Sequence, residues 1–270
     1  MTFLRCLIFF IAATVSIFVS AKENKPSILL YNETEGRAFI EQNVDVVRPF
    51  ASITKLMTAM VSLDYSQDMT RTVKTATSRL PYNTHSIGDV FTAMLVRSDN
   101  GAAEAIAKEY PGGRKEFIKA MNAKAKSLGM HNTHYEDESG LNRKNTSTAK
   151  DLRLMLVAAS KYELIRKTSI QKEVIFETYY KKKVRKVVID NTNKPVLFEF
   201  DNIVVTKTGF TNPAGWCVAL DVEQKGQVYT IIILGAQNKL LRFDTVKDLM
   251  NRYVLRYRPH EEQPVFLFPL

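Results

Sequence analysis

The sequence from residue 49 to residue 57 is Pro49-Phe50-Ala51-Ser52-Ile53-Thr54-Lys55-Leu56-Met57. From Ile53 onward, apolar residues recur at the spacing of one helix face, which predicts a helix that starts near Ser52, just after Pro49. Residues three apart share a helix face, so the Lys55 amine is expected beside the Ser52 hydroxyl. A hydroxyl at a helix start, with an amine one turn later, is the arrangement of an activated nucleophile.

Two further motifs follow in the chain, first Ser98-Asp99-Asn100 and then Lys207-Thr208-Gly209. Ser-x-x-Lys alone occurs by chance in a chain of this length, but the ordered trio is typical of active-serine β-lactamases and penicillin-binding proteins. The chain therefore resembles the penicillin-recognising serine enzymes. The residues around the motifs, over most of the chain from residue 27 to residue 250, resemble the D-alanyl-D-alanine carboxypeptidase and endopeptidase family in particular.

This resemblance implies a serine peptidase that forms an acyl-enzyme on Ser52 and uses no cofactor or metal. Lys55 would accept the Ser52 proton, which requires its pKa to be lowered from about 10.4 by burial and by a nearby cation. Lys207 is the candidate for that cation. By the same resemblance, Ser98 passes the proton to the leaving nitrogen, and Asn100 orients Lys55 and the substrate amide.

The third motif implies the substrate-binding side of the site. By resemblance, Lys207 and Thr208 hold the substrate carboxylate, and Gly209 lets the edge strand approach the acyl chain because it has no Cβ. The backbone N–H groups of Ser52 and Phe210 would form the oxyanion hole. The expected substrates are peptidoglycan stem peptides, and β-lactams are expected to be covalent inhibitors.

The pattern of the whole chain predicts an α/β (α+β) fold of the β-lactamase and transpeptidase type. A hairpin is expected around the turn at 32–36, and helices are expected over 90–96, 102–109, 113–128 and 148–160. Strands are predicted over 174–179, 184–189, 196–200, 203–207, 217–222 and 228–234, before a closing helix over 240–257. Strands from both ends of the chain predict one antiparallel sheet covered by helices, with a helical subdomain.

The N-terminus has the pattern of an export signal. Arg5 precedes an uncharged apolar run, and Val19-Ser20-Ala21 is a small-residue cleavage pattern, so a signal peptide is predicted over residues 1–21. An uncleaved anchor is the alternative. The rest divides into a peptidase domain over 22–258 and a short tail over 259–270. The expected location is the periplasm or cell wall, without a stable membrane anchor after cleavage.

The sequence leaves open which amide bond is cut. The carboxypeptidases that the chain resembles usually add a β-rich domain and a terminal amphipathic helix, and a tail with Pro259 and Pro264 cannot form such a helix. Shorter members of the family are endopeptidases that cut D-alanyl crosslinks, so we favour endopeptidase over carboxypeptidase.

Two other functions remain as alternatives. Glu138 begins a Glu-x-x-Leu-Asn pattern, which in class A β-lactamases carries the deacylating glutamate. A domain that kept this fold without activity would be a non-catalytic penicillin-binding module, although such a module is expected to lose one of the three motifs, and none is lost here.

Composition argues against other classes of function. The net charge is +10, with 24% charged and 45% apolar residues, which is ordinary for a globular protein. The basic run at 181–186 comes without a nucleic-acid motif, so we expect a solvated hairpin and no nucleic-acid partner. His131 and His134 lie in a polar loop and are expected to be surface residues instead of metal ligands. Cys217 has no partner once Cys6 leaves with the signal, and is expected to be buried.

Overall fold

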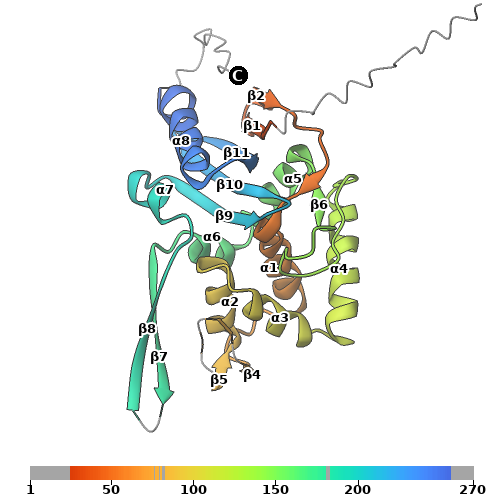
Figure 1. Cartoon of the computed structure of the whole chain (residues 1–270), viewed down its shortest axis with the longest axis vertical. Helices are drawn as coiled ribbons and strands as arrows, with labels where there is room; N and C mark the ends of the chain where they lie inside the picture. The colour runs from red at the N-terminus through yellow and green to blue at the C-terminus, as the bar shows by residue number, and fades with distance from the viewer. Residues whose placement is uncertain (1–24, 76, 79, 81–82, 181–182, 257–270) are drawn as a thin grey trace, which may run out of the picture.

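The protein is described by a computed structural model that covers residues 25–75, 77–78, 80, 83–180 and 183–256 (Figure 1). The predicted signal peptide and the predicted tail after residue 258 lie outside the described residues. Within the described part of the chain, no helix has both the length and the apolar character needed to cross a bilayer.

The chain alternates between strands and helices. The strands are β1 (Ser27–Asn32), β2 (Arg37–Gln42), β3 (Arg48–Pro49), β4 (Thr72–Thr75), β5 (Asn83–Ser86), β6 (Thr146–Ser147), β7 (Glu173–Tyr180), β8 (Lys183–Asp190), β9 (Ile203–Thr211), β10 (Gly215–Gln224) and β11 (Gln227–Ala236). The helices are the 3₁₀ turn η1 (Ala51–Ile53), α1 (Thr54–Tyr65), α2 (Ile87–Val96), α3 (Asn100–Lys108), α4 (Gly113–Ser127), α5 (Ala149–Ala159), α6 (Glu163–Ser169), α7 (Lys194–Glu199), α8 (Lys239–Leu249) and the π-helical turn η2 (Met250–Val254).

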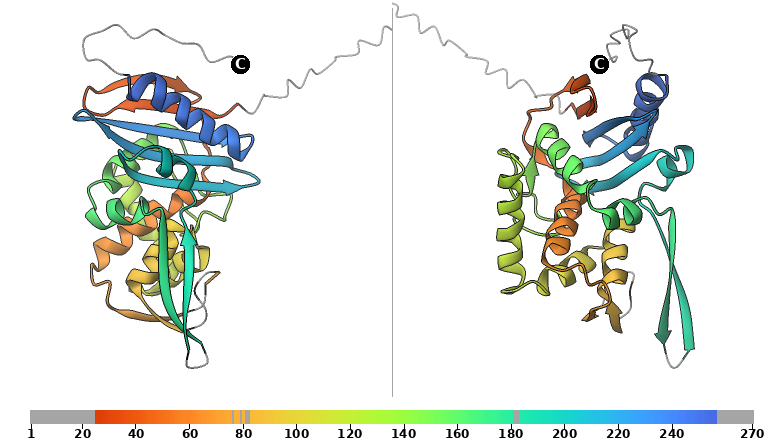
Figure 2. Two further views of the ribbon diagram at one scale, coloured as in Figure 1. Left: turned by 90° about the vertical axis from the view of Figure 1, so that its left-hand side faces the viewer. Right: turned by 180° about the vertical axis from the view of Figure 1, so that it is seen from behind.

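The main sheet is antiparallel and has the strand order β2-β1-β11-β10-β9. It joins the two ends of the chain, because Leu30 of β1 pairs with Ile231 of β11. Ile231 and Ile233 point into the core under α8, whereas Ile232 and Leu234 point into the core shared with α1 and α5. Both faces are covered, which explains the unbroken apolar run in β11 (Figure 2). The predicted sheet from both chain ends is confirmed.

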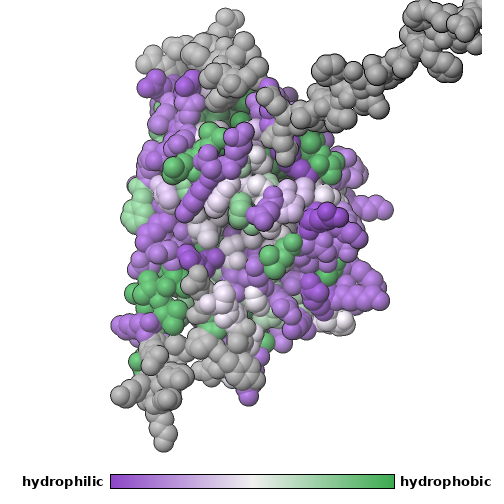
Figure 3. All heavy atoms as spheres, in the orientation of Figure 1, coloured by the Kyte–Doolittle hydropathy of each residue, from purple (hydrophilic) through white to green (hydrophobic). Residues whose placement is uncertain are grey.

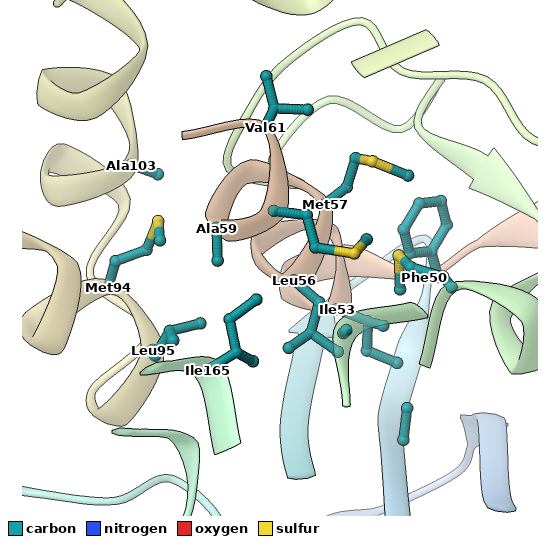
Figure 4. Close-up of a cluster of buried hydrophobic side chains, with 14 of the residues drawn as sticks. Phe50, Ile53, Leu56, Met57, Ala59, Val61, Met94, Leu95, Ala103 and Ile165 are labelled. Atoms are coloured by element: carbon teal, nitrogen blue, oxygen red, sulfur yellow. The ribbon is translucent and has the colours of Figure 1, made fainter. Parts of the chain in front are cut away.

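Helix α1 lies at the centre of the larger core. Every residue from Thr54 to Leu63 is buried, so this helix is enclosed on all sides. Side chains of Met94 on α2, Ala103 on α3 and Ile165 on α6 surround it (Figure 4). The helices α2, α3 and α4 form the expected helical subdomain beside the sheet, and η1 attaches the start of α1 to β9.

Three local predictions were wrong or incomplete. Residues 196–200 were predicted as a strand, but residues 196–199 belong to α7 and Phe200 is its C-cap. Val196, Leu197 and Phe200 are buried at helical spacing. Helix α6 and the small β4–β5 hairpin were not predicted. The closing helix was predicted over 240–257, but its α-helical part ends at Leu249 and continues as the π-helical turn.

The hairpin of β7 and β8 projects away from the body of the molecule (Figure 1). Apolar side chains lie on its surface (Figure 3), with Ile175, Val184 and Val188 all exposed. Lys186 is exposed as expected for a solvated hairpin, whereas residues 181 and 182 lie outside the described part.

Candidate active site

Ser52 lies in η1, directly before the first residue of α1. The predicted helix start near Ser52 is therefore confirmed, with 3₁₀ geometry in its first turn. Gly209 of β9 lies against this turn, because a Cβ built on it would be 2.9 Å from both Phe50 O and Ser52 N. The missing Cβ of Gly209 thus admits the protein's own backbone, in addition to the acyl chain that the sequence suggested.

Lys55 is fully buried one turn after Ser52. Its Nζ lies 2.9 Å from Ser52 Oγ, 2.7 Å from Asn100 Oδ1 and 2.6 Å from the carbonyl oxygen of Ser139. The last two atoms can only accept hydrogen bonds, so they fix two N–H bonds of the amine. In the neutral amine, the third direction is a lone pair, and it points at the Ser52 hydroxyl.

The Ser98-Asp99-Asn100 motif connects α2 to α3. Asp99 is the N-cap of α3, and its carboxylate accepts from Ala102 N at 3.1 Å and from Ser78 Oγ at 2.9 Å. Ser98 has a φ of +65°, which is uncommon for a residue with a Cβ. This turn places the Ser98 and Asn100 side chains in the cavity that Ser52 lines. The motif therefore both caps α3 and brings two side chains to the cavity, and the catalytic roles of those side chains stay predictions.

Lys207, Thr208 and Gly209 lie on β9, the edge strand of the main sheet. The buried Nζ of Lys207 lies 2.9 Å from Ser98 Oγ and donates to Thr208 O at 3.0 Å. On the next residue, Thr208 Oγ1 lies 2.6 Å from Thr192 Oγ1. Phe210 follows with 45% of its surface exposed, and its ring stacks on Trp216 at a centroid distance of 4.1 Å.

Burial lowers the pKa of both lysines. It lowers the pKa of Lys55 to about 7, against the opposing effect of the carboxylates of Asp137, Asp99 and Glu138. For Lys207, burial is again the largest cause, and the charges of Lys55 and Arg242 lower its pKa further. Burial, one of the two expected causes, is therefore the largest cause for Lys55, and the charge interaction between the two amines acts on the pKa of Lys207.

The segment 137–142 closes the site behind Lys55. The Asp137 carboxylate accepts from the backbone N–H groups of Ser139, Gly140 and Asn142 at 2.9, 2.5 and 2.5 Å. This bonding holds the Ser139 carbonyl against Lys55. The neighbouring Glu138 side chain is 3% exposed and accepts from Arg114 Nε at 2.7 Å. Glu138 does not line the cavity around Ser52, and its carboxylate is occupied by Arg114.

The cavity at Ser52 has a volume of about 700 Å³. Six of the eight predicted site residues line this cavity. The other two, Lys55 and Lys207, are buried and do not line it. Sequence analysis missed several lining residues that belong to no recognised motif, namely Arg97, Asn191, Thr192, Trp216, Lys239 and Arg242. The buried Arg242 donates to Cys217 O at 3.1 Å and Gly209 O at 3.4 Å, so α8 also supports β9.

Two predictions concern residues outside this cavity. His134 Nε2 lies 2.9 Å from Glu136 Oε1, and within the described residues no group of three potential metal ligands occurs. Cys217 is buried and has no disulfide partner there, and burial raises the pKa of its thiol to about 11.

The family profile described as D-alanyl-D-alanine carboxypeptidase matches residues 19–238. The chain belongs to this family. D-alanyl-D-alanine endopeptidases of Escherichia coli and Pseudomonas aeruginosa are each 38% identical to this peptidase, over 80% of its length and 73% of theirs. A D-alanyl-D-alanine carboxypeptidase of Bacillus subtilis is 27% identical, over 89% of this chain and 64% of the relative.

Solved structures agree with this family membership. The crystal structure of a Streptomyces DD-transpeptidase is 25% identical to this peptidase, with a TM-score of 0.77 over 83% of this chain and 95% of the other. A Listeria monocytogenes penicillin-binding protein in its cefotaxime-bound form is 31% identical, with a TM-score of 0.72 over the same shares. The predicted resemblance, fold type and hydrolase class are confirmed.

Proposed function

We propose that this peptidase hydrolyses D-alanyl amide bonds in peptidoglycan stem peptides through an acyl-enzyme on Ser52, and that its main substrates are crosslinks. The observation that carries the proposal is the amine of Lys55, which lies 2.9 Å from Ser52 Oγ with its pKa lowered to about 7. A base with a pKa near the working pH is the most effective kind for removing a proton in the transition state.

In the first step, the Ser52 hydroxyl transfers its proton to the neutral Lys55 amine while Oγ bonds to the substrate carbonyl carbon. The resulting oxyanion accepts from the N–H groups of Ser52 and Phe210, where one such donor contributes about 3 kcal/mol in the transition state. Gly209 supports this geometry because it lets β9 lie against the Ser52 turn.

In the second step, the carbon–nitrogen bond breaks and the leaving amine takes a proton from Lys55 by way of Ser98. The contact of Ser98 Oγ with Lys207 Nζ at 2.9 Å supports this route, because it fixes the Ser98 hydroxyl on the wall of the cavity that Ser52 also lines. Lys207 and Thr208 bind the carboxylate next to the scissile bond. Water then attacks the ester carbonyl carbon and gives its proton to Lys55. The bond from this carbon to Ser52 Oγ breaks, and Lys55 returns the proton to Oγ.

The preference for crosslinks rests on the relatives. Those that are 38% identical are named endopeptidases, whereas the matched relatives named carboxypeptidases are 25% to 28% identical. Carboxypeptidase activity on a terminal D-alanine is the second candidate, since it uses the same chemistry. The pairing of Glu138 with Arg114 disfavours a class A β-lactamase.

The place of action follows from the substrate. The chain would be exported by the signal predicted over residues 1–21 and would act in the periplasm or cell wall. Sequencing the N-terminus of the exported protein tests this, and Met1 at the N-terminus would contradict cleavage.

The function is tested with purified protein on three substrates: crosslinked dimer muropeptides, a monomer pentapeptide and a labelled penicillin. We expect dimers to be split, and a mass increase on Ser52 after penicillin treatment. Ser52→Ala removes the nucleophile and should abolish turnover and covalent labelling. If only the pentapeptide loses D-alanine, the preference for crosslinks is wrong, and if labelling persists in Ser52→Ala, another residue is the nucleophile.

A further inference from the structure

The catalytic cavity has a strongly cationic lining. Arg97, Lys194, Lys239 and Arg242 line it, together with a single carboxylate, that of Asp190. Such an excess of positive charge favours an anionic ligand and raises its local concentration.

Two of these four cations are engaged within the protein. Arg242 donates to the carbonyl oxygens of Cys217 and Gly209. The Lys194 amine lies 2.5 Å from Asp190 Oδ1 and 3.3 Å from Glu173 Oε2, so it is neutralised by two carboxylates. Lys239 is exposed and lies over the Phe243 ring at 6.0 Å.

Arg97 differs from the others. Its side chain is half-buried and lines the cavity, but among the described residues it makes no hydrogen bond or ion pair. The carboxylate on its wall of the cavity, Asp190, forms its ion pair with Lys194, which lowers the pKa of Asp190, and the charge of Arg97 lowers it further without a direct contact. A guanidinium is a rigid, planar donor suited to carboxylates, so Arg97 presents an unused carboxylate-binding group to the cavity.

The position of Arg97 indicates which part of a substrate it meets. It directly precedes Ser98, the residue that faces the leaving nitrogen in the proposed mechanism. The adjoining wall is formed by residues 190–192, since Thr192 N donates to Val96 O at 3.1 Å and Thr192 Oγ1 lies 2.6 Å from Thr208 Oγ1. Arg97 therefore adjoins the residue that faces the leaving nitrogen, and the wall next to it also contacts Thr208.

We propose that Arg97 binds a second carboxylate on the leaving group, one that a crosslinked stem peptide has and a single D-alanine lacks. The inference rests on the proposed function. A terminal D-alanine carries one carboxylate, which Lys207 and Thr208 occupy. In a crosslink, the leaving amine belongs to a neighbouring stem peptide, whose other acidic residues carry carboxylates further from the scissile bond. Arg97 thus selects crosslinks over pentapeptides.

The test compares kcat/KM on crosslinked dimers with kcat/KM on a monomer pentapeptide for wild type, Arg97→Gln and Arg97→Lys. Loss of one charge-assisted contact should lower the ratio of the two values about 10-fold in Arg97→Gln. The ratio for Arg97→Lys should lie between those of wild type and Arg97→Gln, because lysine keeps the positive charge but lacks the paired N–H donors of a guanidinium. Dimers amidated only at the carboxylates further from the scissile bond keep the carboxylate that Lys207 and Thr208 bind. On these dimers the wild type should lose its preference, and Arg97→Gln should not differ from wild type.

The matched control is Arg166→Gln, an exposed arginine on α6 that does not line this cavity. It makes the same change in net charge and should leave the ratio unaltered. The rate of penicillin acylation reports whether each variant is folded. A ratio that stays at the wild-type value in Arg97→Gln, or falls equally in Arg166→Gln, overturns the inference. If the wild type cleaves no dimer at all, the proposed function itself is wrong. That outcome differs from one in which dimers are cleaved but Arg97→Gln leaves the ratio unchanged.

Discussion

The α-carbon of Gly140 faces the carbonyl of Ala51 so closely that a Cβ on Gly140 would lie 2.0 Å from the Ala51 oxygen. Gly140 also has a φ of +84°, which side chains rarely allow. These two residues join the loop that holds Lys55 to the turn that carries Ser52. The tight fit means that the nucleophile and its base are positioned by one packed contact.

We therefore expect Gly140→Ala to displace this loop and withdraw the Ser139 carbonyl from Lys55. Strained backbone and overpacking together should lower the free energy of unfolding by about 3 kcal/mol or more. Penicillin acylation should slow as well, because the Lys55 amine loses one of its two fixed acceptors. Urea unfolding and acylation kinetics measure the two effects.

The control for Gly140→Ala is Gly226→Ala in the β10–β11 turn. Gly226 has a φ of +74°, but a Cβ on it would meet no atom within 4 Å. Gly226→Ala introduces backbone strain without a steric clash. It should therefore lower the free energy of unfolding by only about 1 to 2 kcal/mol and leave the acylation rate unaltered. Equal losses of stability in the two variants would show that the contact with Ala51 is not tight.

A second prediction concerns the pH dependence of acylation. Only the neutral form of Lys55 can accept the Ser52 proton, and its pKa is lowered to about 7. The acylation rate constant should therefore rise about tenfold per pH unit below the pKa, and level off about one unit above it. Stopped-flow measurement with a chromogenic β-lactam between pH 5 and 9 checks this. A rate that keeps rising tenfold per pH unit up to pH 9, without levelling off, would mean that Lys55 keeps an ordinary pKa.

Much of this arrangement could be predicted from the sequence, because the chemistry needs specific residues at short, regular spacings. Ser52 and Lys55 share one helical turn, and their neighbours have an unambiguous helical period. Asn100 and Lys207 were predicted only through resemblance, since they are brought to Lys55 and Ser98 by folding over long distances in the chain. No spacing rule connects residues that far apart.

Helix α7 shows why one local prediction failed. Residues 196–200 form a mostly apolar run, which is equally compatible with a buried strand and a short helix. The deciding signal was Pro195, which lies in the first turn of α7, where its missing N–H costs nothing. Arg97 and Arg242 gave no signal at all, because a cation that lines a cavity looks like any surface arginine in sequence.

A third prediction distinguishes this peptidase from a class A β-lactamase. Glu138 is bound by Arg114 and lies outside the cavity, so Glu138→Gln should leave the lifetime of the penicilloyl-enzyme unchanged. It should lower stability, because it leaves a charge-assisted hydrogen bond incomplete. Arg114→Gln removes the other partner of the same ion pair. It should likewise lower stability and leave the lifetime of the penicilloyl-enzyme unchanged. A longer acyl-enzyme lifetime in Glu138→Gln alone would assign deacylation to this glutamate.

The last prediction concerns Asp221, a carboxyl buried in the main sheet on β10. Thr230 Oγ1 donates to its Oδ1 at 2.7 Å, while Oδ2 has no hydrogen-bond partner among the described residues. Burial raises the pKa of Asp221 from 3.8 to about 7. Between these two values the folded protein holds a proton that the unfolded chain releases. Stability must therefore fall as the pH rises through this window, by about 1.4 kcal/mol per pH unit at most.

Asp221→Asn mimics the protonated carboxyl, because its amide oxygen can still accept from Thr230. The variant should lose this contribution to the pH dependence, so its stability relative to wild type should increase between pH 5 and pH 8. Asp244→Asn removes an exposed carboxylate on α8 and should keep the wild-type slope. Urea unfolding at pH 5, 6, 7 and 8 gives the three slopes. If the slopes of wild type and Asp221→Asn coincide, Asp221 does not hold a proton in this range.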